Sequence, residues 1–228
     1  MDIPITILSI EGNIGSGKST VINTLKEYYK SSDKSSNKVY FLEEPVSEWV
    51  EFKDSDGKNI IEKFYEDQEH YSFSFQMMAY ISRLALFRKA ISENYDIIIT
   101  ERSMFTDKNV FAKMLYDSGN MRCIDYQIYN KWFDEFVDII KNMKIVYIRT
   151  SPEICNKRII KRARLGENIP INYLQDCHYY HEIWLSDPEF MEKGNVLVIN
   201  GNEETNTSLF IENSYYDSII DKVYNFIS

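Results

Sequence analysis

Apolar residues along the chain gather into five short runs of strand length, separated by longer segments with the spacing of amphipathic helices. The runs cover residues 3–10, 39–42, 95–100, 146–148 and 196–199. The third of them, YDIIIT, has the composition of a strand that is buried on both faces. Strands that alternate with helices are typical of α/β proteins. The pattern therefore predicts a five-stranded parallel sheet flanked by helices.

Helical spacing predicts one helix from the end of the first strand to about residue 30 and a longer helical region at residues 60–94, interrupted near residues 67–71. Further helices are expected at residues 105–116, 125–141, 169–185 and 211–226. Another should begin at Ser151-Pro152-Glu153, with the serine as its cap. A chain of 228 residues without repeats suits a single domain that spans residues 1–228.

A glycine-rich turn joins the first strand to the first helix in the segment ITILSIEGNIGSGKST. From Gly12 to Ser19 it matches the phosphate-binding pattern G-x-x-x-x-G-K-[ST]. In this arrangement backbone N–H groups surround a polyphosphate, Lys18 reaches the β- and γ-phosphates, and Ser19 holds Mg²⁺. The segment predicts binding of ATP or another nucleoside triphosphate with Mg²⁺. The residues expected to bind it are Gly12, Asn13, Ile14, Gly15, Ser16, Gly17, Lys18, Ser19 and Thr20.

Charged residues directly follow the second and third predicted strands. Glu44 follows residues 39–42, and Glu101 and Arg102 follow residues 95–100. Because parallel strands end at one edge of a sheet, these side chains should lie beside the phosphate loop. Glu44 is a candidate general base, although its own segment equally allows a solvated loop carboxylate. Glu101 suits Mg²⁺, directly or through water, and Arg102 suits a phosphate or a carboxylate.

A basic cluster stands out because the chain as a whole is acidic, with a formal net charge of −9. Its members share one predicted helix and the segment just after it, and they are Lys157, Arg158, Lys161, Arg162 and Arg164. We expect a local anion site there, the alternative being an ordinary solvated basic face. The break at residues 166–168 predicts a loop that can close over a bound nucleotide.

Composition narrows the class of partner. The acidic charge and the absence of a basic tail argue against nucleic acid polymers. No apolar run approaches the length of a membrane span, and we expect no targeting segment. The three cysteines lie far apart without a C-x-x-C pair, which suits a reducing compartment. A cytoplasmic protein is expected.

Together these features predict a phosphoryl transferase of the small-kinase type. A nucleotide acceptor already carries an ionised oxygen, whereas an alcohol must lose a proton, so Glu44 favours an alcohol. One alternative is a thymidylate-type nucleoside monophosphate kinase. A second is a P-loop switch ATPase, although the chain lacks guanine-reading segments.

Several motifs follow one another in a fixed order: EGNIGSGKST, EEPVSEW, an FY…SFSFQ…SR run, ERS followed by D…F, RIIKRAR and HYYHEIWL. They resemble the deoxynucleoside kinases, the group of deoxycytidine, deoxyguanosine and insect-type multisubstrate kinases. The resemblance extends over about residues 5–185. It implies a P-loop kinase fold with an arginine-rich lid at about residues 158–169, a homodimer, and ATP-dependent phosphorylation of the 5′-hydroxyl of a deoxyribonucleoside in nucleotide salvage.

The resemblance also implies a role for each residue that matches a motif. Glu44 would be the base on the 5′-hydroxyl, with Arg102 beside it and Glu101 supporting Mg²⁺. Tyr65 and Glu167 would hold the 3′-hydroxyl. The lid is one residue shorter than in most relatives, and Gly166 takes the first place of an expected acidic pair. The phosphates in transit would be held by Lys18, Arg158, Arg162 and Arg164.

The resemblance also implies which residues would surround the base of the nucleoside. Gln76 would read its edge with paired hydrogen bonds, and offsets of three and four place Ala79 and Arg83 on the same helical face. Ala79, Arg83 and Asp107 match the family's specificity positions, and an Asp–Arg pair suits an amino-bearing ring better than thymine. We therefore expect deoxycytidine, deoxyadenosine or deoxyguanosine to be preferred over thymidine. The apolar contacts would come from Ile14, Trp49, Phe75 and Phe111.

Overall fold

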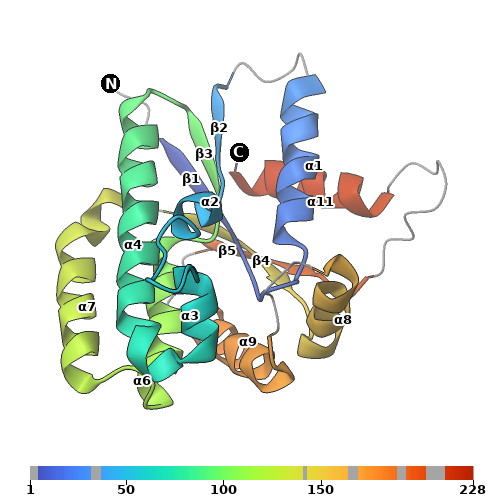
Figure 1. The fold of residues 1–228 in the computed structure, drawn as a ribbon. Helices are drawn as coiled ribbons and strands as arrows, with labels where there is room; N and C mark the ends of the chain where they lie inside the picture. The colour runs from blue at the N-terminus through green and yellow to red at the C-terminus, as the bar shows by residue number, and fades with distance from the viewer. Residues whose placement is uncertain are drawn as a thin grey trace.

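The centre of the molecule is a sheet of five parallel strands in the order β2-β3-β1-β4-β5 (Figure 1). A computed structural model describes residues 5–31, 37–140, 143–163, 169–188, 194–203 and 214–227. The strands are β1 (Thr6–Glu11), β2 (Val39–Leu42), β3 (Ile97–Glu101), β4 (Lys144–Arg149) and β5 (Val196–Asn200). The predicted five-stranded parallel sheet flanked by helices is confirmed.

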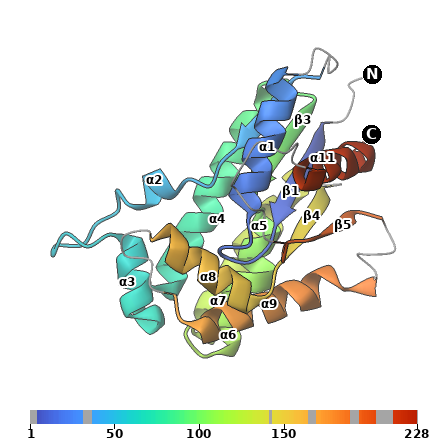
Figure 2. The ribbon, with the colours of Figure 1, turned by 90° about the vertical axis from the view of Figure 1, so that its right-hand side faces the viewer.

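Helices cover both faces of this sheet because its strands are apolar on both sides. In β3, Ile97 and Ile99 enter one core, whereas Ile98 between them enters the other. The first core is closed by α1 (Lys18–Ser31) and α11 (Ser214–Ile227). The second is closed by α4 (Gln68–Ser92), α7 (Cys123–Phe136) and α9 (Ile171–Leu185). Figure 1 shows α4 and α7 on the opposite side of the sheet from α1, and Figure 2, seen from the α1 side, shows α4 behind α1.

The shorter helices are α2 (Val46–Trp49), α3 (Ile60–Glu66), α5 (Met104–Thr106), η1 (Asp107–Ala112), α6 (Lys113–Asp117), η2 (Val137–Ile140) and α8 (Pro152–Arg162). Of these, α2, α5 and α8 begin shortly after the carboxyl ends of β2, β3 and β4, whereas η2 leads into the amino end of β4. The predicted break in the long helical region is confined to Asp67, whose Oδ1 accepts a hydrogen bond from the N–H of His70 at 3.1 Å. The segment η1 is a π-helix, which the helical spacing alone did not predict.

The start of α8 corrects one expectation. Ser151 occupies the cap position before Pro152, as predicted, but its side chain makes no capping hydrogen bond. Its backbone N–H instead donates to Oδ1 of Asn202 at 2.8 Å, which ties the start of α8 to the loop after β5.

Among the described helices, none combines the length and apolar composition that crossing a membrane requires.

Candidate active site

The phosphate loop lies at the carboxyl end of β1 and is fixed by close backbone packing. Gly12 has a φ of 144°, and a Cβ there would lie 2.7 Å from the carbonyl oxygen of Ile148. Gly15 has a φ of 77°, and its Cβ would lie 2.7 Å from the carbonyl oxygen of Cys155. Only glycine fits at either position, and this lets the loop pack closely against β4 and α8.

Lys18 is held by the same loop. Its Nζ donates to the carbonyl oxygen of Asn13 at 2.8 Å and lies 3.9 Å from the Glu101 carboxylate. Burial, and next the charge of Arg102, lower the pKa of Lys18 to about 8. The side chain of Asn13 bridges the loop and α9: its Oδ1 accepts a hydrogen bond from the backbone N–H of Ile14 at 2.8 Å, and its Nδ2 donates to the carbonyl oxygen of Leu174 at 2.8 Å. The second of these bonds attaches the phosphate loop to α9.

A cavity of about 970 Å³ opens at this edge of the sheet. Of the loop, Ile14, Gly15, Gly17, Lys18, Ser19 and Thr20 line it, whereas Gly12, Asn13 and Ser16 do not. Arg164 and Glu167 lie outside the described residues. The other predicted site residues that line the cavity are Glu44, Trp49, Tyr65, Phe75, Gln76, Ala79, Arg83, Glu101, Arg102, Asp107, Phe111, Arg158 and Arg162.

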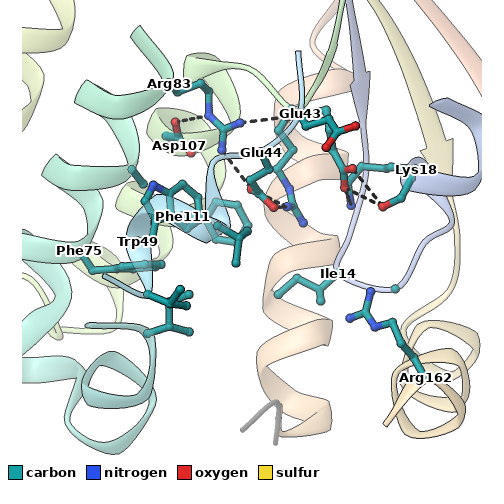
Figure 3. A pocket seen from close by; sticks show the side chains of 18 of the residues that line it. Ile14, Lys18, Glu43, Glu44, Trp49, Phe75, Arg83, Asp107, Phe111 and Arg162 are labelled. Atoms are coloured by element: carbon teal, nitrogen blue, oxygen red, sulfur yellow. Dashed lines mark hydrogen bonds and ion pairs between the residues drawn. The ribbon is translucent and has the colours of Figure 1, made fainter. Parts of the chain in front are cut away.

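Glu44 lies at the middle of the cavity, between two arginines (Figure 3). Its Oε1 accepts a hydrogen bond from Nη2 of Arg83 at 3.1 Å and from Nη1 of Arg102 at 3.0 Å. Burial alone would raise the pKa of Glu44, but the charges of Arg102 and Arg83 outweigh it and lower the pKa to about 2. The carboxylate is therefore ionised at neutral pH and is held in one orientation. It can accept a hydrogen bond from a hydroxyl group.

Arg83 connects Glu44 to a second carboxylate. Its side chain is 1% exposed, and its Nε donates to Oδ2 of Asp107 at 3.0 Å. Its Nη1 donates to the carbonyl oxygen of Glu101 at 3.0 Å. Burial raises the pKa of Asp107 to about 6, against the opposing charge of Arg83. The guanidinium thus spans from the end of β3 to η1.

Arg102 reaches Glu44 from an unusual backbone conformation. Its φ of 59° lies in the left-handed region, which is strained for a residue other than glycine. The backbone N–H of Arg102 donates to the carbonyl oxygen of Ile10 at 3.1 Å. Its guanidinium carbon lies 5.4 Å from the centre of the Phe111 ring, a cation–π contact. These contacts hold the side chain in the cavity wall.

The far end of the cavity is aromatic. Trp49 packs edge-on against Phe75 at 5.7 Å, and its Nε1 donates to the hydroxyl of Ser82 at 2.9 Å. Figure 3 shows Trp49, Phe75 and Phe111 on the α4 side of the cavity, across from Lys18 and Arg162. Gln76 is 2% exposed, and its Oε1 has no hydrogen-bond partner among the described residues. A buried amide oxygen of this kind suits a polar edge of a planar ligand.

Ser19 and Glu101 bring oxygen atoms together at the start of α1. The hydroxyl of Ser19 donates to the Glu101 carboxylate, at 3.0 Å from Oε2 and 3.2 Å from Oε1. Hydroxyl and carboxylate oxygens are ligands that Mg²⁺ prefers, and both side chains line the cavity. The residues present therefore fit Mg²⁺.

The two described arginines of the basic cluster differ in their contacts. Arg158 donates from Nη1 to the carbonyl oxygen of Ser16 at 3.0 Å and from Nη2 to that of Glu203 at 3.2 Å. It therefore joins the phosphate loop to the segment after β5. Arg162 lines the cavity one helical turn further along α8. Lys157 and Lys161 are not among the lining residues.

Two residues near this site were not expected from the sequence. Tyr173 of α9 lines the cavity and packs edge-on against Tyr65 at 6.2 Å. Glu11, the last residue of β1, is fully buried and accepts hydrogen bonds from hydroxyl groups of β1 and of the segment after β3. The signal available for Glu11 was an acid that directly follows an apolar strand, the same signal that singled out Glu101.

The chain is similar to known proteins over most of its length. A family model described as "Deoxynucleoside kinase" matches residues 8–228. A probable deoxycytidine kinase of Fowlpox virus (strain NVSL) is 41% identical over 227 residues, covering 97% of this chain and 88% of that protein. Homo sapiens deoxycytidine kinase is 31% identical over 249 residues, which cover 97% of this chain and 90% of that protein.

A third relative carries a different name. Homo sapiens mitochondrial thymidine kinase 2 is 34% identical over 186 residues, with 79% of this chain and 64% of that protein covered. The relatives thus differ in the nucleoside that they are named for, while the family match covers nearly the whole chain. The chain belongs to the deoxynucleoside kinase family.

Proposed function

We propose that this phosphotransferase moves the γ-phosphoryl group of ATP to the 5′-hydroxyl of a deoxynucleoside, with deoxycytidine as its preferred acceptor. The observation that carries the proposal is the Glu44 carboxylate, held between Arg83 and Arg102 in the cavity that Lys18 also lines. In this arrangement the ionised Glu44 carboxylate can accept a hydrogen bond from a hydroxyl group of the substrate. A nucleoside monophosphate would bring a second anion to the same place, which disfavours a monophosphate kinase.

In this proposal Glu44 orients the 5′-hydroxyl and accepts its proton. The pKa of about 2 makes Glu44 a weak base, but the transition state of phosphoryl transfer is loose and develops little charge on the attacking oxygen. Proton transfer can then come late, and the larger contribution of Glu44 is to place the hydroxyl in line. Arg102 holds Glu44 and can contact the transferred phosphoryl group from the same position.

On the donor side, the phosphate loop and Lys18 would hold the triphosphate, with Arg162 and Arg164 of the lid facing the phosphoryl group and Arg158 supporting the loop. Ser19 and Glu101 would hold Mg²⁺, which neutralises phosphate charge when bound. Tyr65 and Glu167 would hold the 3′-hydroxyl, and Tyr65 lines the cavity as this role requires.

Deoxycytidine is placed first for two reasons. Relatives at 41% and 31% identity are named as deoxycytidine kinases. In addition, the unpaired Oε1 of Gln76 and the Arg83–Asp107 pair offer hydrogen bonds to an amino-bearing base edge. Trp49 and Phe111 would lie on the two faces of the base, with Ile14, Phe75 and Ala79 beside it. At C4 thymine has a carbonyl oxygen where cytosine has an amino group, and at C5 it has a methyl group where cytosine has a hydrogen, so thymidine should be the poorest substrate.

We also propose a single domain over residues 1–228 and a homodimer. Ile124, Ile128 and Trp132 form an apolar stripe on α7, at 56%, 39% and 46% exposure. Ile81 of α4, which packs beside α7, is 44% exposed (Figure 1). A second copy of the chain would cover this self-complementary helical face.

The test is ATP turnover with each of the four deoxynucleosides and with dCMP and dTMP. We expect turnover with the nucleosides, in which kcat/KM is highest for deoxycytidine and lowest for thymidine. Consumption of ATP only with the monophosphates would show a nucleotide kinase instead. Turnover that does not depend on any acceptor would indicate a switch ATPase.

A further inference from the structure

A fully buried carboxylate lies just below the candidate active site. Ile7, Ser9 and Glu11 occupy alternate positions of β1, and Ile7 belongs to the core on the α4 side of the sheet. Glu11 therefore faces the same layer, where α5 begins. Its Oε1 accepts hydrogen bonds from the hydroxyls of Ser9 at 2.6 Å and Ser103 at 2.8 Å.

The other oxygen, Oε2, accepts a hydrogen bond from the hydroxyl of Thr106. Thr106 Oγ1 in turn accepts from the backbone N–H of Ser103 at 3.3 Å. Glu11 therefore binds the segment after β3 at two points, one of them the residue next to Arg102. A buried carboxylate that accepts hydroxyl hydrogen bonds on both oxygens fixes its donors firmly, because releasing it would leave a charge without partners.

The segment after β3 that Glu11 binds also contains the strained backbone of Arg102. Arg102 has a φ of 59°, and this left-handed turn directs its side chain to Glu44. Such a conformation persists only where the surroundings enforce it. On the β3 side, the hydroxyl of Thr100 donates to the carbonyl oxygen of Arg102 at 2.8 Å. On the other side, the constraint comes from Glu11 through Ser103.

We propose that Glu11 is a positioning residue, which holds Ser103 and Thr106 so that Arg102 keeps its strained turn and its contact with Glu44. The inference rests on the roles proposed for Glu44 and Arg102. Glu11 does not line the cavity, so its effect on turnover passes through Arg102. The competing view is that Glu11 only stabilises the junction of β1 and α5, without any specific effect on Arg102.

A matched pair of variants separates these views. Ser9→Ala and Ser103→Ala each remove one hydroxyl bond to the same Oε1, but only Ser103 adjoins Arg102. We expect Ser103→Ala to lower kcat roughly 10-fold, with the KM for ATP within about twofold of wild type. Ser9→Ala should keep kcat within about twofold. Equal losses of kcat in the two variants, or a loss confined to KM, would overturn the proposal.

A double-mutant cycle supplies the second measurement. Glu11→Gln should lower kcat in the wild-type background and have no further effect in an Arg102→Ala background. Additive losses would overturn this inference alone. If Arg102→Ala leaves kcat unchanged, the role proposed for Arg102 fails, and the role of Glu11 fails with it. Thermal unfolding of each variant shows that it is folded, and the serine pair carries the test if Glu11→Gln is not.

Discussion

Arg83 and Glu44 are joined by a hydrogen bond of 3.1 Å, from Nη2 of the guanidinium to Oε1 of the carboxylate. The same guanidinium holds Asp107 through its Nε at 3.0 Å. One buried side chain therefore links the residue proposed to read the base to the residue proposed to orient the hydroxyl. A change at Arg83 should affect both the choice of substrate and the rate of the chemical step.

The first prediction concerns that choice. Arg83→Met combined with Asp107→Ala removes the buried ion pair as a unit and opens space for the methyl group of thymine. We expect the ratio of kcat/KM for thymidine to that for deoxycytidine to rise by roughly 10- to 100-fold. Removing both partners avoids an unpaired buried charge, so the double variant should fold better than Arg83→Met alone. An unchanged ranking of the four deoxynucleosides would show that these positions do not face the base.

The second prediction concerns Glu44. Glu44→Gln should lower kcat by roughly 10²- to 10⁴-fold with a modest change in KM, because the amide cannot accept the proton and no longer balances Arg83 and Arg102. Glu48→Gln is the matched control, since Glu48 is four residues away, is exposed and does not line the cavity. It should retain nearly normal kinetics. Near-normal turnover of Glu44→Gln would remove this residue from the mechanism.

The third prediction follows from the pKa of Asp107, which burial raises to about 6. Above pH 6 the carboxylate is ionised and can accept a hydrogen bond from the amino group of cytosine, whereas below pH 6 it becomes protonated. We expect the KM for deoxycytidine to rise as pH falls below 6, by up to about tenfold per pH unit. Glu44 stays ionised in this range, since its pKa is about 2. Steady-state kinetics from pH 5 to 8 test this, and a flat KM would contradict it.

Asp107→Asn provides the control for the pH experiment. Asparagine cannot ionise, so the KM of this variant for deoxycytidine should no longer vary with pH around 6. If the variant keeps the pH dependence of the wild type, another group is responsible for it.

Much of the fold could be predicted because the strands carry their own signal. The run at residues 97–99 is three isoleucines in a row, which is typical of a buried strand. The glycines before Lys18 predict the phosphate loop together with the strand before it and the helix after it. By contrast, α2 has only four residues, too few to show a helical period. The π-helix η1 has only six residues and lies within a longer helical segment, so the spacing of apolar residues does not distinguish it from an α-helix. The sequence therefore did not reveal that η1 begins at Asp107.

Part of the candidate active site could also be predicted from the sequence, and part of it could not. Glu44 and Arg102 could be brought together from sequence, since each follows a parallel strand of one sheet. The bond from Arg83 to Glu44 could not, because Arg83 lies on α4 and the bond depends on how that helix packs on the sheet. Glu11 was missed because an acid before a phosphate loop looks like part of the motif, and its burial is a tertiary property.

The last prediction concerns the proposed dimer. Ile124→Glu places a charge in the apolar stripe of α7, where a partner copy would have to bury it, and we expect the variant to sediment as a monomer. Ile183→Glu on α9 is the matched control, since Ile124 and Ile183 are 56% and 54% exposed. The control should sediment as the wild type does. Sedimentation velocity at micromolar concentration decides between the outcomes, and either a monomeric wild type or dissociation caused only by Ile183→Glu would contradict the proposal.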